Sequence, residues 1–300
     1  MKENILITGG AGFIGSHTVE LINERDKYNI VILDDLSTGK LSNLENLKYT
    51  FIQGDILDLN LLDNIFHKYR FKYVIHLAAQ VSVGKSCVNP KLDADLNIIG
   101  TINILELSKK YSVNKIIFSS SAAVYGVPKY LPIDESHDIS PLSFYGLSKY
   151  TCENYIKMYS KMYGLNYIIY RYANVYGERQ DSNGEAGVVS IFYDNMKLNN
   201  PITIHGDGLQ TRDFISVKDI AKANFLGIEK NVYNEIINIG TNNETNLIEL
   251  VSIIEKSNNY KFNVKYIETR TGDIKNSCLN TDKMFKLLDY KADKINKIKW

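Results

Sequence analysis

The sequence has few of the residues from which disulfides and metal sites are built. Its 300 residues include three cysteines, Cys87, Cys152 and Cys278, which are far apart and form no CxxC pair. This spacing argues against a disulfide framework and against a thiolate metal site. The five histidines show no HExxH or other ligand spacing, so we predict that the protein holds no metal ion.

An excess of charge of one sign and long apolar runs are also missing. Lysine and arginine (35) nearly balance aspartate and glutamate (34), so no overall field attracts nucleic acid or an anionic membrane. No apolar run approaches the roughly 20 residues of a membrane-spanning helix. The N-terminus, MKENILITGG, leads straight into a strand pattern. We therefore expect a cytoplasmic protein without nucleic-acid or membrane partners.

The first half of the chain alternates short β-branched runs with longer amphipathic stretches. Near-continuous apolar strands separated by helices indicate a parallel sheet covered on both faces. The runs expected as strands are NILIT, NIVILD, YTFIQGD, YVIHLAA, KIIFSSS and LNYIIYRYA. Helices are expected from about Phe13 and over 59–69, 93–111 and 143–163, the last ended by Gly164. The predicted fold class is α/β, with a doubly wound, Rossmann-like parallel sheet.

The second half has a looser pattern. Loop-like stretches alternate with short helices expected over 188–198, 217–229, 246–257 and 281–288. We interpret residues 1–173 as the Rossmann domain, to which a segment at about 215–240 returns. Residues 174–214 and 241–300 form a smaller C-terminal substrate-binding lobe in this interpretation. Neither repeats nor a low-complexity linker separates the two parts, so one shared cleft is expected.

The stretch TGGAGFIGSH, Thr8 to His17, carries a glycine pattern between a strand and a helix. Gly9, Gly12 and Gly15 fit GxxGxxG, and Gly10 with the last two also satisfies GxGxxG. Such glycines permit a tight turn, let the backbone approach a pyrophosphate and let helix pack on strand. The helix N-terminus then offers free N–H groups to the anion. The pattern predicts a dinucleotide site.

Two acidic positions refine this prediction. Asp34 ends the second strand, where a carboxylate accepts hydrogen bonds from a ribose diol and repels a 2′-phosphate, so NAD is favoured over NADP. Asp35 could share or take this role. Asp55, in GDI after the third strand, is a candidate adenine contact, and its alternative is a helix cap.

A tyrosine, a lysine and a serine run supply candidate catalytic groups. Tyr145 and Lys149 in SFYGLSKYTCE are at i and i+4, hence neighbours on one helix face. A nearby ammonium group favours a phenolate, which would make Tyr145 a general base. The serines of FSSSAAVYG leave the carboxyl end of an apolar strand, where ligands bind in parallel sheets. Spacing alone does not decide which serine acts.

These motifs together resemble the extended short-chain dehydrogenase/reductases. Within them, the chain is similar to the NAD-dependent nucleotide-sugar epimerase/dehydratase family, most closely to UDP-hexose 4-epimerases acting on UDP-glucose or UDP-N-acetylglucosamine. The resemblance covers nearly the whole chain. Its motifs are TGGAGFIGSH, DDLSTG, GDI, HLAAQ, NIIGT, SSSAAVYG, YGLSK, YRYANVYGERQ, GDGLQTRDFISVKDI and RTGD.

The resemblance implies a role for each matching residue. Ser121 is the catalytic hydroxyl, Tyr145 the base, and Lys149 holds the nicotinamide ribose and lowers the pKa of the tyrosine. The implied cofactor-binding residues are Gly9, Gly12, Phe13, Ile14, Gly15, Asp34, Asp55, Ile56, Ala78, Ala79, Asn97, Tyr145, Lys149 and Tyr172. The implied substrate-binding residues are Ser82, Ser121, Tyr145, Asn174, Arg212, Arg270, Asp273 and Ser277.

Four positions on the substrate side carry specific expectations. Arg212 and Arg270 resemble the contacts to the diphosphate, for which the guanidinium fork is suited, although a salt pair between lobes is their alternative. Ser277 matches a position on the C2 side of the sugar where a bulky tyrosine restricts relatives to unmodified hexoses. A serine leaves room for an N-acetyl group. His205 stands where many relatives carry an aromatic residue near uracil.

The implied reaction is C4 epimerisation of a UDP-hexose through a 4-keto sugar, with NAD regenerated in each turnover. Alternatives are a 4,6-dehydratase and a UDP-glucuronate epimerase or decarboxylase. A dehydratase needs an acid pair after the strand-end hydroxyl, where this chain has Ala122 and Ala123. A non-catalytic binding module is the alternative of another class. By analogy, the helices over 93–111 and 145–163 imply a homodimer.

Overall fold

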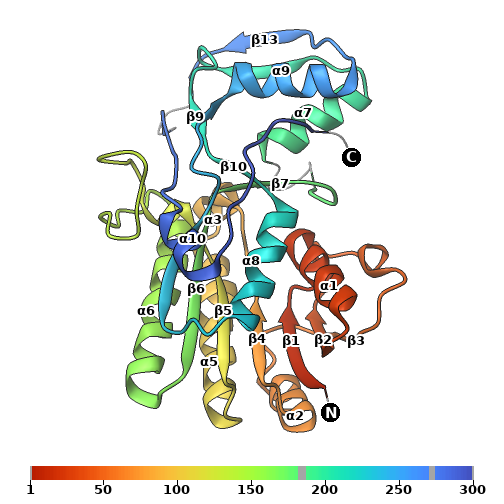
Figure 1. The fold of residues 1–300 in the computed structure, drawn as a ribbon, viewed down its shortest axis with the longest axis vertical. Coiled ribbons are helices and arrows are strands. Elements are labelled where there is room, and N and C mark those ends of the chain that lie inside the picture. The colour runs from red at the N-terminus through yellow and green to blue at the C-terminus, as the bar shows by residue number, and fades with distance from the viewer. Residues whose placement is uncertain (1, 182–186, 270–273, 299–300) are drawn as a thin grey trace.

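A seven-stranded parallel sheet forms the centre of the computed structural model, which describes residues 2–181, 187–269 and 274–298 (Figure 1). The strand order is β11-β6-β5-β4-β1-β2-β3. The strands are β1 (Glu3–Thr8), β2 (Tyr28–Asp34), β3 (Thr50–Gln53), β4 (Tyr73–His76), β5 (Lys115–Ser121), β6 (Asn166–Tyr172) and β11 (Glu235–Ile239). This arrangement confirms the predicted α/β fold with a doubly wound sheet.

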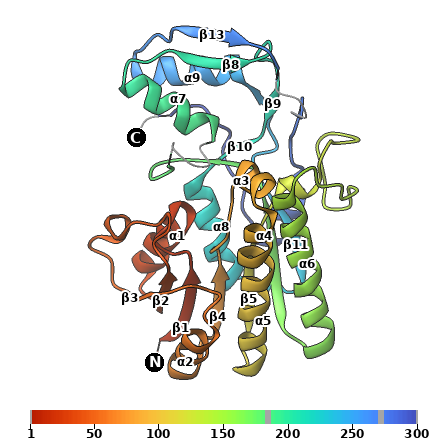
Figure 2. The same cartoon turned by 180° about the vertical axis from the view of Figure 1, so that it is seen from behind.

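The apolar strands are buried on both faces because their alternate side chains enter two different core clusters. Ile5 and Ile7 pack in one cluster, with side chains of α1 (Phe13–Arg25) and α8 (Val217–Glu229). Leu6 packs in the other, with side chains of α2 (Leu59–Tyr69), α5 (Gly100–Lys110) and α6 (Phe144–Tyr163). Figure 2 shows α5 and α6 side by side over that second face.

Helix α6 begins and ends where the sequence predicts. The Ser143 hydroxyl caps it by accepting a hydrogen bond from the Gly146 amide (3.1 Å). Gly164 ends it in the left-handed conformation, with φ of 72°. Since both ends are held by local signals, the phase of the helix, and therefore the face that carries Tyr145 and Lys149, is determined locally.

The helix expected over 93–111 is interrupted. Short helices α3 (Val83–Val88) and α4 (Pro90–Asp93) precede a π-helical turn over Ala94–Ile99, and only then does α5 begin. The Thr101 hydroxyl (2.6 Å) and the Cys152 thiol (3.1 Å) both donate to the Asn97 carbonyl. The Asn97 carbonyl in this wider turn therefore accepts from one side chain of α5 and one of α6, and an amphipathic pattern contains no signal for the second contact.

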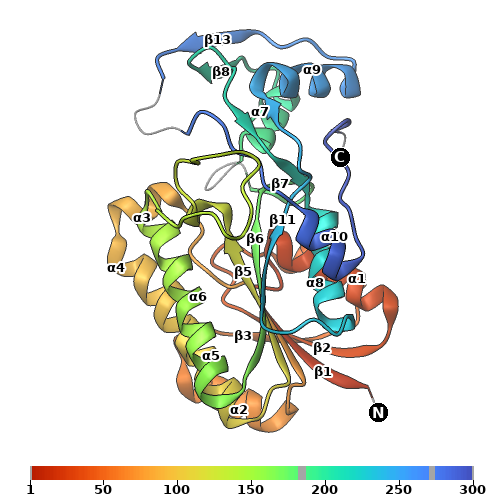
Figure 3. The ribbon, with the colours of Figure 1, turned by 60° about the vertical axis from the view of Figure 1, so that its left-hand side comes forward.

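A smaller lobe lies beyond the carboxyl ends of the sheet strands (Figure 3). It contains α7 (Val188–Lys197), α9 (Leu247–Asn258) and the parallel pair β8 (Ile202–His205) and β13 (Val264–Ile267). Three short strand pairings join its segments or link them to the Rossmann part: β7 (Asn174–Tyr176) with β10 (Phe214–Ser216), and β9 (Thr211–Arg212) with β12 (Thr245–Asn246), besides β8 with β13. No described helix is long and apolar enough to cross a bilayer.

The last described segment connects the cores of both parts. After α10 (Asp282–Leu288), Ala292 packs in the cluster of the Rossmann sheet, whereas Ile295 and Ile298 pack in the cluster of the smaller lobe. The sheet position of β11 agrees with a returning segment. The division of the chain at residues 173 and 174 stays a prediction.

Candidate active site

The glycine loop leaves β1 at the carboxyl edge of the sheet and leads into α1. Gly9 has φ of 70°, and a Cβ on it would lie 2.8 Å from the Ala78 amide nitrogen. A Cβ on Gly15 would lie 2.0 Å from the Gly9 carbonyl oxygen. Gly12 is the N-cap of α1 and no side chain caps this helix. The first N–H groups of α1 therefore remain available to donate hydrogen bonds to an anion such as a pyrophosphate.

Asp34, the last residue of β2, contacts the glycine loop through its carboxylate. It is 6% exposed, and its two carboxylate oxygens accept hydrogen bonds from the amides of Ala11 and Leu36, both at 2.9 Å. Burial raises its pKa. Each oxygen keeps a further lone pair for a ribose hydroxyl. Asp35 is exposed and accepts from the amide and hydroxyl of Ser37 instead, so the structure separates the two candidate carboxylates.

The predicted adenine-side residues lie at the ends of the neighbouring strands. Asp55 accepts from the Leu57 amide (2.9 Å), whereas Asp58 caps α2, so the helix-cap alternative belongs to Asp58. Ile56 is buried, and its carbonyl accepts from Asn103 (3.0 Å). The glycine loop can receive a pyrophosphate, and Asp55 and Ile56 lie at the same edge of the sheet. A dinucleotide could therefore extend along this edge from the loop to these two residues.

A buried histidine links this edge to the helices behind it. The Thr101 hydroxyl donates to the Asn97 carbonyl, so it accepts from Nε2–H of His76 (3.1 Å). Nδ1 of His76 then accepts from the Thr8 hydroxyl (2.7 Å), whose oxygen accepts from the amides of Leu77 and Ala78. Burial lowers the pKa of His76 to about 3, so this tautomer is neutral.

Asn97 and Tyr172, both predicted on the cofactor side, are buried and make hydrogen bonds within the protein. The Asn97 amide group donates to the carbonyl of Gln80 and to Ser148, and its oxygen accepts from the Gln80 amide. The Tyr172 hydroxyl donates to Asn224 (2.7 Å). Contact of either side chain with a cofactor stays a prediction, and the structure adds a positioning role. Ala78 and Ala79 are half-buried where β4 ends.

The three serines of β5 face different surroundings. The Ser120 hydroxyl is buried and donates to Glu153 (2.6 Å). The side chain of Ser121, one position on, lies on the opposite face and is half-buried, and its oxygen accepts from the Ala123 amide (3.1 Å). The backbone carbonyl of Ser119 accepts from the ammonium group of Lys149 (2.9 Å). Ser120 is thus the serine held in the buried network, and Ser121 is the half-buried serine at the last position of the strand.

Lys149 and Tyr145 lie on one face of α6, as their spacing predicts. The ammonium nitrogen of Lys149 is 5.9 Å from the ring centre of Tyr145 and 5.0 Å from that of Phe118. Lys149 is 3% exposed, and burial lowers its pKa to about 8. A Cβ on Gly146 would lie 2.6 Å from the Ala123 carbonyl oxygen. This close approach sets the start of α6 against the turn that follows Ser121.

Sequence reasoning missed a buried ionic network behind these groups. Arg171 of β6 makes a forked pair with Glu153 of α6, Nε to Oε1 at 2.9 Å and Nη2 to Oε2 at 2.7 Å. Arg171 also donates to the Tyr125 hydroxyl (2.9 Å). A charged residue in the middle of the apolar run NYIIYRYA was the available signal, because a buried guanidinium needs a buried partner.

The described substrate-side residues outside the catalytic set come from separate segments: Ser82 from the Rossmann part, and Asn174, Arg212 and Ser277 from the chain beyond residue 173. Asn174 is exposed at the start of β7, and the guanidinium group of Arg212 in β9 donates to the Thr211 carbonyl (2.8 Å). The Ser277 amide donates to that same carbonyl (3.2 Å), so Ser277 lies beside β9. Ser82 is buried and caps α3 through the Lys85 amide (2.8 Å). Arg270 and Asp273 lie outside the described residues.

A pocket of ≈ 530 Å³ opens on the smaller lobe at the end of β8. His205 lies in its wall, and its Nδ1 is 3.2 Å from the Glu268 carbonyl oxygen. The Gln210 amide group donates to the His205 carbonyl (2.8 Å). The lining residues are His205, Gly206, Asp207, Gln210, Thr269, Ile274 and Lys275. This hollow has the size of a small-molecule subsite.

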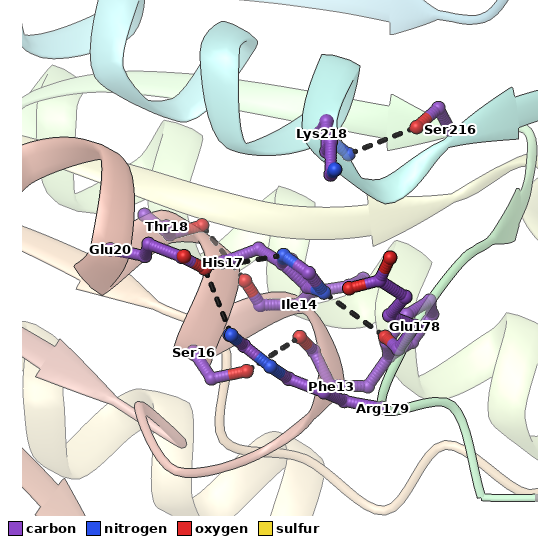
Figure 4. A network of polar contacts seen from close by, with 10 residues as sticks. All are labelled: Phe13, Ile14, Ser16, His17, Thr18, Glu20, Glu178, Arg179, Ser216 and Lys218. Carbon is purple, nitrogen blue, oxygen red and sulfur yellow. Dashed lines mark hydrogen bonds and ion pairs between the residues drawn. The ribbon is translucent and has the colours of Figure 1, made fainter. Parts of the chain in front are cut away.

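A polar network joins α1 to the loop after β7 (Figure 4). His17 lies 3.0 Å through Nε2 from the Glu178 carbonyl oxygen, and the guanidinium group of Arg179 pairs with Glu20 at 3.0 Å. Burial lowers the pKa of His17. These contacts therefore connect α1, whose N-terminus would bind the pyrophosphate, to the chain that leads into the smaller lobe.

Comparisons with known proteins agree with this geometry. Residues 5–240 match the family described as the NAD dependent epimerase/dehydratase family. A Methanocaldococcus jannaschii protein named as a candidate UDP-glucose 4-epimerase is 52% identical over 90% of this chain and 87% of its own. The solved UDP-glucose 4-epimerase of Thermotoga maritima with UDP-glucose superposes with a TM-score of 0.93, at 42% identity, over 97% of this chain and 94% of that one.

A second solved structure broadens the comparison. It is the UDP-N-acetylglucosamine 4-epimerase of Methanobrevibacter ruminantium in complex with UDP-N-acetylmuramic acid, with a TM-score of 0.92 and 38% identity over 98% and 94% of the two chains. The predicted cofactor, NAD, is confirmed by the family. The chain belongs to the NAD-dependent epimerase/dehydratase family.

Proposed function

We propose that the protein catalyses C4 epimerisation of a UDP-hexose. The observation that carries the proposal is the placement of a buried Lys149 and of Tyr145 on one face of a helix that begins against the Ser121 turn. When bound, NAD would supply the reversible hydride acceptor for C4 of the sugar. The glycine loop and Asp34 would hold it.

The chain's own residues would handle the proton. Lys149 is held in a dry site by the Ser119 carbonyl, and its positive charge favours the phenolate of Tyr145. Tyr145 then accepts the proton of the C4 hydroxyl, and Ser121 donates a hydrogen bond to the C4 oxygen as negative charge develops there. The amide of Ala123 keeps the Ser121 oxygen oriented.

Dehydration is the less favoured alternative. Ala122 and Ala123 form a 3₁₀ turn directly after Ser121, where a carboxylic acid would have to protonate the departing hydroxyl. The serine, tyrosine and lysine together also argue against a module that only binds ligand, because binding alone does not need all three.

The reaction can be tested without added cofactor. Purified protein is incubated with each UDP-hexose while the anomeric proton signals are followed by NMR. Appearance of the C4 epimer supports the proposal and also indicates retained NAD. Loss of water or carbon dioxide from the sugar, or no conversion of any UDP-hexose by protein that contains NAD, contradicts it.

We propose that Arg212 binds the diphosphate and that the pocket beside His205 receives the nucleoside. Arg212 lies on β9, and Gln210, two residues before it, lines the pocket, so one short segment would span both subsites. A guanidinium fork suits phosphate oxygens. The Arg212→Lys variant is expected to raise the KM for UDP-hexose more than it lowers kcat, in steady-state assays.

The side chain at position 277 is proposed to set sugar choice. Ser277 is half-buried beside β9, and its small side chain leaves space that a tyrosine would fill. The 38% identical relative from Methanobrevibacter is named for an N-acetylated substrate. We predict that Ser277→Tyr loses conversion of UDP-N-acetylhexoses first, measured as the ratio of kcat/KM for acetylated and plain sugars. An unchanged ratio contradicts this assignment.

We also propose a homodimer that buries the outer face of α6. Phe144, Leu147, Tyr155, Met158 and Met162 are exposed on this helix at spacings that place them on one face. Exposed apolar patches of this kind mark association surfaces. Sedimentation at micromolar concentration should give twice the chain mass of 34.2 kDa.

A cytoplasmic location stays a prediction from the sequence, which fractionation of the source cells would test.

A further inference from the structure

A buried carboxylate outside the catalytic set lies where the segments of the substrate site meet. Asp213 separates β9 from β10 and is 1% exposed. Neither the proposed chemistry nor the motif assignments give it a role. An isolated carboxylate is costly to bury, so the groups that compensate it show what it holds together.

Its side chain accepts hydrogen bonds from two distant segments. Oδ1 accepts from the Thr241 hydroxyl (2.6 Å) and the Thr241 amide (2.9 Å). Oδ2 accepts from the amides of Asn242 and Leu279, both at 3.3 Å. One carboxylate thus joins the end of the β11 segment to the chain that carries Ser277.

The backbone of the same residue reaches a third segment. The Asp213 carbonyl accepts from the Asn174 amide (2.9 Å) at the start of β7. Arg212, the last residue of β9, directly precedes Asp213 in the chain. Thr211, in turn, exchanges backbone hydrogen bonds with Lys275 (2.9 Å) and Ser277 (3.2 Å). Asn174, Arg212 and Ser277, three of the residues proposed to contact the substrate, therefore lie on segments that converge on this position.

We propose that Asp213 is a positioning residue for the UDP-hexose site: its carboxylate sets the spacing of the segments that carry Asn174, Arg212 and Ser277. The proposal rests on the proposed function. It requires that loss of the carboxylate disturb substrate binding before it disturbs the chemistry, because Tyr145, Lys149 and the glycine loop belong to other elements.

The main test is Asp213→Asn in the full-length protein with its NAD. An amide NH2 group turned toward backbone N–H donors cannot accept from them, so one side of the junction must separate. We expect the KM for UDP-hexose to rise at least tenfold while kcat changes less than threefold and NAD content stays that of the wild type. A KM within twofold of the wild type overturns the proposal.

A second, milder variant tests the proposal in case Asp213→Asn does not fold. Thr241→Val keeps the Thr241 amide and the side-chain volume but removes one hydroxyl donor to Asp213. It should raise the KM severalfold at unchanged kcat, and no change in KM overturns the proposal even if Asp213→Asn is unstable. Glu229→Gln is the control, because this carboxylate binds Tyr28 and Lys27 at the other end of α8. Its KM should equal that of the wild type.

Calorimetry with UDP separates this inference from the proposed function. UDP binding by the NAD-containing protein reports on the site whether or not any sugar is converted. If the wild type converts no UDP-hexose, the proposed function fails. If the wild type binds UDP and Asp213→Asn binds it equally well, the positioning role fails.

Discussion

Gly15 shows how one methyl group could decide whether the cofactor binds. A Cβ there would lie 2.0 Å from the Gly9 carbonyl oxygen, so Gly15→Ala must push α1 away from the loop. We predict that the purified variant retains less than about a tenth of the NAD of the wild type, measured as nucleotide released on denaturation. Gly84→Ala is the matched control, because the nearest atom to its Cβ is 3.9 Å away. NAD retained by Gly15→Ala would contradict the loop geometry.

His76 predicts a pH dependence of stability. Its pKa is about 3 in the fold and about 6.5 when unfolded, so the unfolded chain binds the proton first. The stabilising contribution is complete above pH 6.5 and is lost as the pH falls below it. Between pH 7 and 5 this residue should lower the free energy of unfolding by about 2 kcal/mol. In His76→Gln, urea unfolding should lose that part of the decline; an identical decline refutes the buried neutral form.

At this scale, the sequence predicts residues that belong to a motif and does not reveal residues whose partners are distant in the chain. Gly9 and Asp34 were predicted from a motif, and they lie in the geometry that the motif requires. The five histidines show no motif, and their spacing does not reveal that His76 lies between Thr8 and Thr101. Asp213 and the Glu153 network escaped for the same reason, since their partners are distant in sequence.

At the scale of elements, the start of α6 lies against the turn after Ser121, so it connects the two segments that are proposed to be catalytic. A Cβ on Gly146 would lie 2.6 Å from the Ala123 carbonyl oxygen, so Gly146→Ala should displace Tyr145 relative to Ser121. Misplacing a catalytic group by about 1 Å can lower the rate by up to about 100-fold. We expect kcat to fall at least tenfold with NAD retained, by steady-state kinetics and nucleotide analysis. Asn154→Ala, exposed on the same helix, should keep the wild-type kcat.

Element boundaries followed the sequence closely where local signals exist. Helices α2 and α8 begin and end where the apolar pattern predicts, and α6 is bounded by a serine cap and a glycine. The short strand pairs of the smaller lobe were not predicted, since two- or three-residue strands carry almost no period. In the π-helical turn before α5, the Asn97 carbonyl also accepts from the Cys152 thiol of α6, a contact that no local pattern contains.

At the scale of the whole molecule, the apolar face of α6 predicts self-association. Met158 is 51% exposed in the middle of this face, so Met158→Glu would place a charge in the proposed interface. We expect its sedimenting mass to fall from twice the chain mass to 34.2 kDa at micromolar concentration. Tyr266→Glu, exposed on β13, is the control and should remain a dimer. A wild-type monomer, or no change on substitution, contradicts this interface.

The sequence by itself determined the parallel sheet, the glycine loop and the order of serine, tyrosine and lysine. These depend on periodicity and on contacts within a few residues, which a linear pattern records. Only the tertiary structure decided that Ser120 is buried against Glu153, how His76 is protonated and what surrounds Asp213. Those outcomes depend on burial and on hydrogen-bond partners from distant segments, and in a buried site the full set of partners determines charge and orientation.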